Sequence, residues 1–177
     1  MSNRIVISEY DPQWPAIYKE EVGRILAVAG NTITAVEHIG STSVPGLGAK
    51  PIIDIMAAVA QIDEAMALVE PLSALEYTYL PEYEEMIPER RFFRRGLESP
   101  SHHLHIVETT TDFWIDHLLF RDYLRSHRET AVEYEQIKRN LAARLGDDRA
   151  AFTVAKTLFI EPVLARARTW RESSPSA

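Results

Sequence analysis

Short stretches in which hydrophobic and polar positions alternate recur along the first two thirds of the chain. This period of two is typical of β-strands. The predicted strands are 4–8, 34–40, 51–59, 77–80, 91–95 and 104–107. The stretch 51–59 is apolar at nearly every position except Asp54, as expected for a strand that is covered on both faces. Together these stretches predict a mixed β-sheet.

Two of the segments between these strands have apolar residues at intervals of three and four, which is the spacing of a helix. It predicts a helix at 16–28 and a second one at 63–75. Asp63 is the expected N-cap of the second helix, and Pro71 is expected to kink it. We expect both helices to flank the sheet.

Beyond the last strand, the apolar stripes are helical throughout 112–170, with a stop at Gly146 and a kink expected at Pro162. Residues 171–177 are rich in Ser and Pro and are expected to form a frayed tail. No linker divides the chain. The fold class we predict is α/β (α+β), a mixed sheet flanked by helices with a helical C-terminal part, in a single domain at 1–170.

Composition and charge exclude several classes of protein. The 177 residues include no cysteine, so disulfides, thiolate nucleophiles and cysteine-ligated zinc or iron–sulfur sites are absent. The formal net charge of -7 argues against nucleic-acid binding by phosphate neutralisation. No apolar run is long enough for a signal peptide or a membrane span, so we expect a cytoplasmic protein with no membrane partner.

The stretch that connects 34–40 to 51–59 carries the most unusual local pattern. Gly40, Ser41 and Thr42 open a segment that is rich in glycine and hydroxyl side chains and is followed by Lys50. Backbone N–H groups and hydroxyls can donate to phosphate oxygens, and the lysine can add a positive charge. The segment therefore predicts a phosphate-binding loop. The alternative is an ordinary Gly/Pro turn.

Asp54 is the lone acid of the apolar strand that follows this loop. An ionised carboxylate inside a sheet needs a partner, and a divalent metal ion is one candidate. Alternation places Asp54 on the same side as Ile52 and Met56, so a thioether stands where a second acidic ligand would lie. The alternative is a structural acid that accepts hydrogen bonds from buried amides.

Histidines supply the second candidate cluster. His103 and His105 point to the same side of their strand, and His38 lies at the end of the strand before Gly40. Imidazoles on one face can bind a transition metal, relay protons or contact phosphate. We therefore name His38, His103 and His105 as candidate metal ligands together with Asp54. Partly exposed strand histidines without a ligand are the alternative.

Basic side chains gather around the strand 91–95 and along the C-terminal helices. They are Arg90, Arg91, Arg94, Arg95, Arg121, Arg125, Lys138 and Lys156. We select Arg91, Lys138 and Lys156 as candidate phosphate-binding residues, the alternative being simply solvated charges.

The run Glu-His-Ile-Gly-Ser-Thr-Ser-Val-Pro-Gly-Leu-Gly-Ala-Lys-Pro-Ile-Ile-Asp-Ile at 37–55 resembles the GrpB family of bacterial proteins. Further matching motifs lie at 10–15, 91–93, 103–107, 120–125, 134–138 and 156–160. This resemblance implies a nucleotidyltransferase-like fold. It implies that Gly40-Ser41 cradles a nucleoside triphosphate and that Asp54 is the first acid of the metal-binding strand. At Met56 the match to active nucleotidyltransferases ends.

Three functions remain open at this stage. The first is a metal-dependent nucleotidyltransferase with Asp54 and Lys50 as catalytic residues, using a divalent metal that is Mn²⁺, Zn²⁺ or Mg²⁺. The second is a non-catalytic module that binds a nucleotide or phosphorylated metabolite and has lost the two-metal centre. The third is a metal-dependent phosphohydrolase. In each case the expected partner is a nucleoside triphosphate or another phosphorylated small molecule.

Overall fold

The computed structural model describes residues 4–96 and 100–173. Within these residues, the sheet is formed by β1 (Ala35–Ile39), β2 (Ile52–Ala58), β3 (Thr78–Tyr79), β4 (Arg91–Arg95) and β5 (Ser101–Val107). The helices are α1 (Trp14–Ala29), α2 (Val69–Ser73), α3 (Asp112–Ser126), α4 (Arg128–Leu145) and α5 (Arg149–Ser173). Short 3-10 helices are η1 (Ser41–Ser43), η2 (Ile62–Leu68) and η3 (Pro81–Tyr83).

The five strands form one mixed sheet in the order β1-β2-β5-β4-β3. The central pair, β2 and β5, is parallel, and the other neighbouring pairs are antiparallel. Both central strands are buried over most of their length, which explains the nearly continuous apolar run of β2. The predicted mixed sheet flanked by helices is confirmed.

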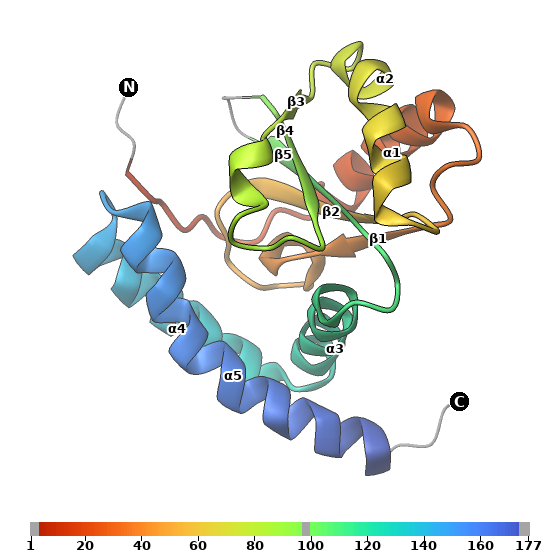
Figure 1. The fold of residues 1–177 in the computed structure, drawn as a ribbon. Coiled ribbons are helices and arrows are strands. Elements are labelled where there is room, and N and C mark those ends of the chain that lie inside the picture. The colour runs from red at the N-terminus through yellow and green to blue at the C-terminus, as the bar shows by residue number, and fades with distance from the viewer. Residues whose placement is uncertain (1–3, 97–99, 174–177) are drawn as a thin grey trace.

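Helices cover the two faces of the sheet unequally. On one face, α1 and α2 pack on side chains from β2, β4 and β5 to form the largest hydrophobic cluster. On the other face, Trp114 of α3 packs against Met56 and Val107. The long helices α4 and α5 lie side by side beyond α3 and pack against the segment between β1 and β2 (Figure 1).

Two predicted elements differ from the structure. The expected helix at 63–75 is instead η2 followed by the five-residue α2, because Pro71 has no N–H to donate to an α-helical carbonyl. Asp63 is not the N-cap, since Gln61 occupies that position and the N–H of Ile62 donates to Glu108.

The expected strand at 4–8 is reduced to a single bridge between Ser8 and Ala49. Ile5 and Ile7 alternate inward as predicted, but they pack on α4 and α5 rather than joining the sheet.

The predicted helical portion after 112 is observed as α3, α4 and α5, with α5 continuing through Pro162. Helix α5 ends at Ser173, three residues into the stretch that we expected to fray, and 174–177 lie outside the described residues. None of the described helices combines the length and the apolarity that crossing a bilayer requires.

Candidate functional site

The loop that follows β1 is pressed against the carboxylate of Asp54. Gly40 has a φ of 71°, a left-handed conformation that favours glycine. A Cβ at this position would collide with Oδ2 of Asp54. Glycine is therefore required here both by the backbone and by the close approach, and Ser41 follows as the first residue of η1.

Strand register brings Asp54 and the two histidines to one face of the sheet. Asp54 lies opposite His103 in the parallel pair, and Met56 lies opposite His105. Oδ1 of Asp54 is 3.2 Å from Nδ1 of His103 and 3.7 Å from Nε2 of His105. The expected clustering of Asp54, His103 and His105 is therefore present in the structure.

The pKa values of Asp54 and His105 both depart from their ordinary values. Burial raises the pKa of Asp54, but hydrogen bonds and charge from His103 and His105 outweigh it and hold the pKa below its ordinary value. Burial lowers the pKa of His105 to about 4, against the opposing effect of Asp54. An ionised carboxylate therefore faces a neutral His105 at pH 7.

This donor set fits a divalent metal ion. One carboxylate oxygen and two imidazole nitrogens lie within 4.8 Å of one another. Ligand atoms around a tetrahedral zinc lie about 3.3 Å apart, given bonds of about 2.0–2.1 Å, and the separations of 3.2 and 3.7 Å are close to that value. A mixed nitrogen and oxygen set suits Mn²⁺ or Zn²⁺, whereas Mg²⁺ prefers oxygen alone.

Three lysines surround the other side of Ser41. Lys138 donates to Oγ of Ser41 at 2.9 Å and to the carbonyl of Gly48 at 2.5 Å. Lys50 and Lys156 both lie over the ring of Phe152, at 4.8 and 5.2 Å. The lysines come from the loop, α4 and α5, so the structure brings three of the four predicted phosphate-binding cations together from distant segments.

Burial is the main cause of the depressed pKa values of these lysines. It lowers the pKa of Lys138 to about 7 and that of Lys50 to about 8, and it also lowers the pKa of Lys156. Neighbouring positive charges add to the shift of Lys50 and Lys138. A bound anion would relieve this repulsion.

Helices α3 and α4 hold the loop in place through polar contacts that the sequence did not predict. Arg125 donates twice to the carbonyl of Ser43, and Glu135 accepts from the N–H of Gly48 at 2.7 Å. Arg121 donates to the carbonyl of His38 at the end of β1. The motifs 120–125 and 134–138 could have indicated these contacts, because their charged residues recur at helical spacing and so share one side of a helix.

Arg90 is a second residue that the sequence analysis did not select, although it was one of four arginines noted around β4. Its side chain is buried, and its guanidinium lies over the rings of Phe92 and Phe113. Its NH1 is 3.4 Å from Nδ1 of His105. Arg90 thus contacts His105 at the ring nitrogen that does not face Asp54.

Two selected residues lie on the opposite face of the sheet and are not brought to the cluster. His38 stacks on Tyr18, and its Nε2 lies 3.1 Å from the hydroxyl of Thr42. Thr42 in turn donates to the carbonyl of Ile52, so its hydroxyl is engaged within the fold. Arg91 pairs with Glu84 at 3.3 Å.

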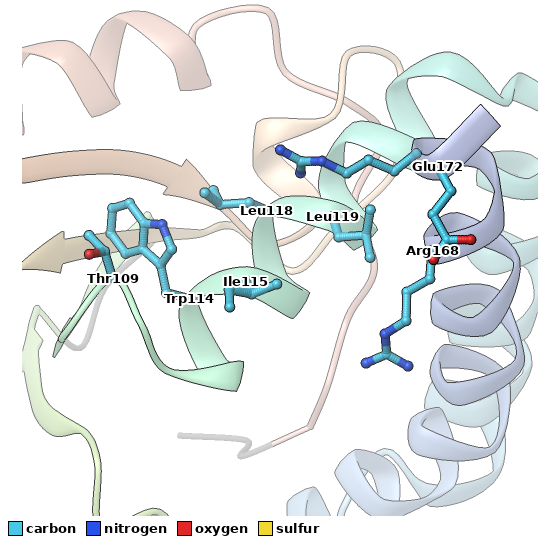
Figure 2. A pocket seen from close by; sticks show the side chains of 8 residues that line it. Thr109, Trp114, Ile115, Leu118, Leu119, Arg168 and Glu172 are labelled. Atoms are coloured by element: carbon cyan, nitrogen blue, oxygen red, sulfur yellow. The ribbon is translucent and has the colours of Figure 1, made fainter. Parts of the chain in front are cut away.

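A hollow of about 480 Å³ lies between α3 and the end of α5 (Figure 2). Trp114, Ile115, Leu118 and Leu119 form its apolar wall, and Arg168 stands at its edge. None of the selected site residues lines it. The candidate site is therefore the cluster beside the loop, in which His105 and Lys138 are buried, rather than this hollow.

Comparison with known proteins identifies the family. A family model described as GrpB protein matches residues 4–166. The chain belongs to the GrpB family. A crystal structure of GrpB from Enterococcus faecalis superposes with a TM-score of 0.84 at 33% identity, covering 94% of this chain and 100% of that chain. The GrpB resemblance and the mixed α/β architecture are thereby confirmed.

Two curated relatives are longer than this GrpB chain. The UPF0157 protein YqkA of Bacillus subtilis is 36% identical over 174 residues, which cover 98% of this chain and 50% of that protein. A dephospho-CoA kinase of Mycolicibacterium paratuberculosis is 28% identical over 187 residues, covering 93% of this chain and 46% of that protein. The chain thus spans about half the length of these relatives.

Proposed function

We propose that this GrpB-family chain binds a nucleoside triphosphate, or another phosphorylated small molecule, together with a divalent metal ion. With a triphosphate, it transfers the nucleotidyl group to an acceptor and releases pyrophosphate. The observation that carries the proposal is that Gly40 packs directly against Asp54 of the carboxylate-imidazole cluster while the next residue, Ser41, accepts from Lys138. Phosphate transfer needs both parts of the site, the carboxylate-imidazole cluster for a metal ion and the lysines, because metal and ammonium groups together neutralise the anion.

The lysine half of the site supports an anionic ligand. Within the described residues, the ammonium groups of Lys50 and Lys156 make no hydrogen bond or ion pair, and both are partly buried against Phe152. Desolvating a cation without a counter-charge is unfavourable. Phosphate oxygens would supply that charge, with Lys138 presenting the hydroxyl of Ser41.

In the metal half of the site, the ion would be bound at the carboxylate of Asp54, beside the imidazoles of His103 and His105. A bound metal ion would polarise a phosphoryl oxygen and offset charge that develops during transfer. Asp54 and Lys50 are the proposed catalytic residues, one on each side of the phosphates. His38, Thr42 and Arg91 are left out of the proposed set because their polar groups are engaged elsewhere in the fold.

The name of one relative supports a phosphorylated ligand. The matched protein from Mycolicibacterium paratuberculosis carries the name dephospho-CoA kinase, which supports a ligand of the nucleotide or coenzyme type. Nucleoside triphosphates are cytoplasmic metabolites, so the proposal also places the chain in the cytoplasm.

Thermal unfolding of metal-stripped protein tests the proposal. Each nucleoside triphosphate is added with Mg²⁺, Mn²⁺ or Zn²⁺ to the wild type, to Asp54→Ala and to the control Asp63→Ala, whose carboxylate is exposed on η2. We expect one triphosphate to stabilise the wild type and the control, by about 2.7 kcal/mol at one hundred times Kd. We expect no stabilisation of Asp54→Ala. A wild type unaffected by every combination would overturn the proposal.

Met56 favours a second candidate, a module that binds the ligand without turnover. The thioether is fully buried and lies opposite His105, where it offers no oxygen to a second metal ion. Release of pyrophosphate by the wild type, absent in Asp54→Ala, would exclude the binding module. Release of inorganic phosphate in its place would indicate a phosphohydrolase.

A further inference from the structure

We infer that Arg90 fixes the tautomer of His105, so that His105 turns its Nε2–H towards the Asp54 carboxylate and does not bind a metal ion through Nε2. Arg90 is then a positioning residue that acts through His105. The consequence for metal binding rests on the proposed function, whereas the tautomer itself does not.

The surroundings of Arg90 leave its guanidinium little freedom. The residue is only 8% exposed. The guanidinium carbon lies 5.0 Å from the centre of the Phe92 ring and 5.4 Å from that of Phe113. Within the described part of the chain, no carboxylate pairs with it, and its buried Nε has no hydrogen-bond partner. Its polar contact with another side chain is the one from NH1 to His105, at 3.4 Å.

The chemistry of this contact determines where the proton of His105 lies. A guanidinium has five N–H donors and no acceptor. Nδ1 of His105 must therefore accept, and the proton of the neutral ring resides on Nε2. This assignment follows from the cation beside Nδ1, whatever occupies the other side of the ring.

The proton on Nε2 points towards the carboxylate. Nε2 of His105 lies 3.7 Å from Oδ1 of Asp54, and His103 approaches the same oxygen. Oδ2 is left facing Gly40. The two imidazoles thus hold Asp54 with one oxygen turned to the histidines and the other presented to the loop.

Metal ligation by His105 would require the opposite tautomer. A neutral histidine that binds a metal through Nε2 carries its proton on Nδ1 and donates it to a carboxylate, a carbonyl or water. Here that proton would meet a donor N–H of Arg90. The cation ligands at this site are therefore Asp54 and His103, and His105 contributes orientation only.

Nitrogen-15 NMR of histidine-labelled, metal-free protein measures the tautomer directly, with His105→Gln identifying the His105 signals. We expect the Nε2–H form in the wild type and in Arg90→Lys, which keeps a donor. Arg90→Gln offers a carbonyl acceptor of similar reach, so we expect the Nδ1–H form to become populated. A wild-type His105 in the Nδ1–H form would overturn the inference, even if no Arg90 variant folds.

Zinc titration of the same metal-free proteins by calorimetry provides the second readout. We expect Arg90→Gln to bind Zn²⁺ at least about 10-fold more tightly than the wild type, in line with the effect of outer partners on metal affinity, and Arg90→Lys to match the wild type. His103→Gln should weaken binding strongly and His105→Gln by less than about 3-fold. Equal losses in the two histidine variants would refute the inference.

These outcomes separate the inference from the proposed function. If no triphosphate stabilises the protein but His105 is in the Nε2–H form, the proposed function fails and the inference stands. If His105 is in the Nδ1–H form while Asp54-dependent stabilisation persists, the inference alone fails.

Discussion

The two faces of the sheet are built for different tasks. On the face covered by α1 and α2, side chains such as Ile55, Phe93 and Ile106 form one continuous apolar cluster. On the face covered by α3, the apolar contacts divide into smaller clusters. Asp54, His103 and His105 lie on this face, and the lysines lie on the loop and helices that cover it. The comparison teaches that the larger apolar cluster lies on one face, whereas the other face combines smaller apolar clusters with the polar groups of the candidate site.

The largest expected effect is on the apolar face. Phe93 is completely buried in the main cluster. Phe93→Ala should lower the free energy of unfolding by about 3–5 kcal/mol, because it removes a large side chain and leaves a cavity. Urea denaturation measures the loss, and ligand affinity at low urea should stay within about 2-fold of the wild type while the protein is folded. A loss under about 1 kcal/mol would contradict the proposed division between the faces.

Lys138→Met, on the face that carries the candidate site, should change ligand affinity strongly and stability little. The methionine keeps the length of the side chain, and the removal of a buried charge offsets the lost hydrogen bonds to Ser41 and Gly48. Stability should therefore change by no more than about 1.5 kcal/mol. Phosphate-ligand affinity, measured by calorimetry, should fall at least about 10-fold. Unchanged affinity would remove Lys138 from the binding site.

The smallest effect is a change with pH. Because the pKa of Lys138 is about 7 and that of Lys50 about 8, their ammonium groups are lost as the pH rises from 7 to 9. Ligand affinity should fall over this range by a few-fold, and Lys138→Met should flatten the profile.

Stability should move in the opposite direction. Between pH 7 and the ordinary lysine pKa of 10.5, the unfolded chain binds more protons at Lys138 than the folded chain does. Unfolding free energy should therefore rise with pH in the wild type, and this contribution should be missing in Lys138→Met. A profile that is the same in both proteins would contradict the depressed pKa.

Local pattern was sufficient to predict most of the architecture. The alternation in β5 and the apolar run of β2 identify strands without tertiary information. The pattern failed at 63–75, where Pro71 interrupts α-helical bonding, and at 4–8, where inward-facing residues pack on helices instead of pairing. In both places a correct apolar period did not determine the backbone hydrogen bonds.

The site was predictable only within single strands. Alternation shows that His103 and His105 share a face, but not whether Asp54 or His38 shares it with them, because that depends on register between strands that are distant in sequence. The same limit applies to Arg91, which was selected over Arg90. Arg90 precedes β4, so no strand period assigned its direction.

The loop beside Asp54 and the residues that brace it are far apart in the order of synthesis. Glu135 reaches back 87 residues to Gly48, Lys138 reaches back 97 residues to Ser41, and Arg125 reaches back 82 residues to Ser43. On the ribosome, all the strands of the sheet emerge before α4 does. In a nascent chain Arg125 of α3 can therefore contact the loop first, but Glu135 and Lys138 can do so only after α4 has emerged. A chain shortened before α4 should lose its site before it loses its sheet.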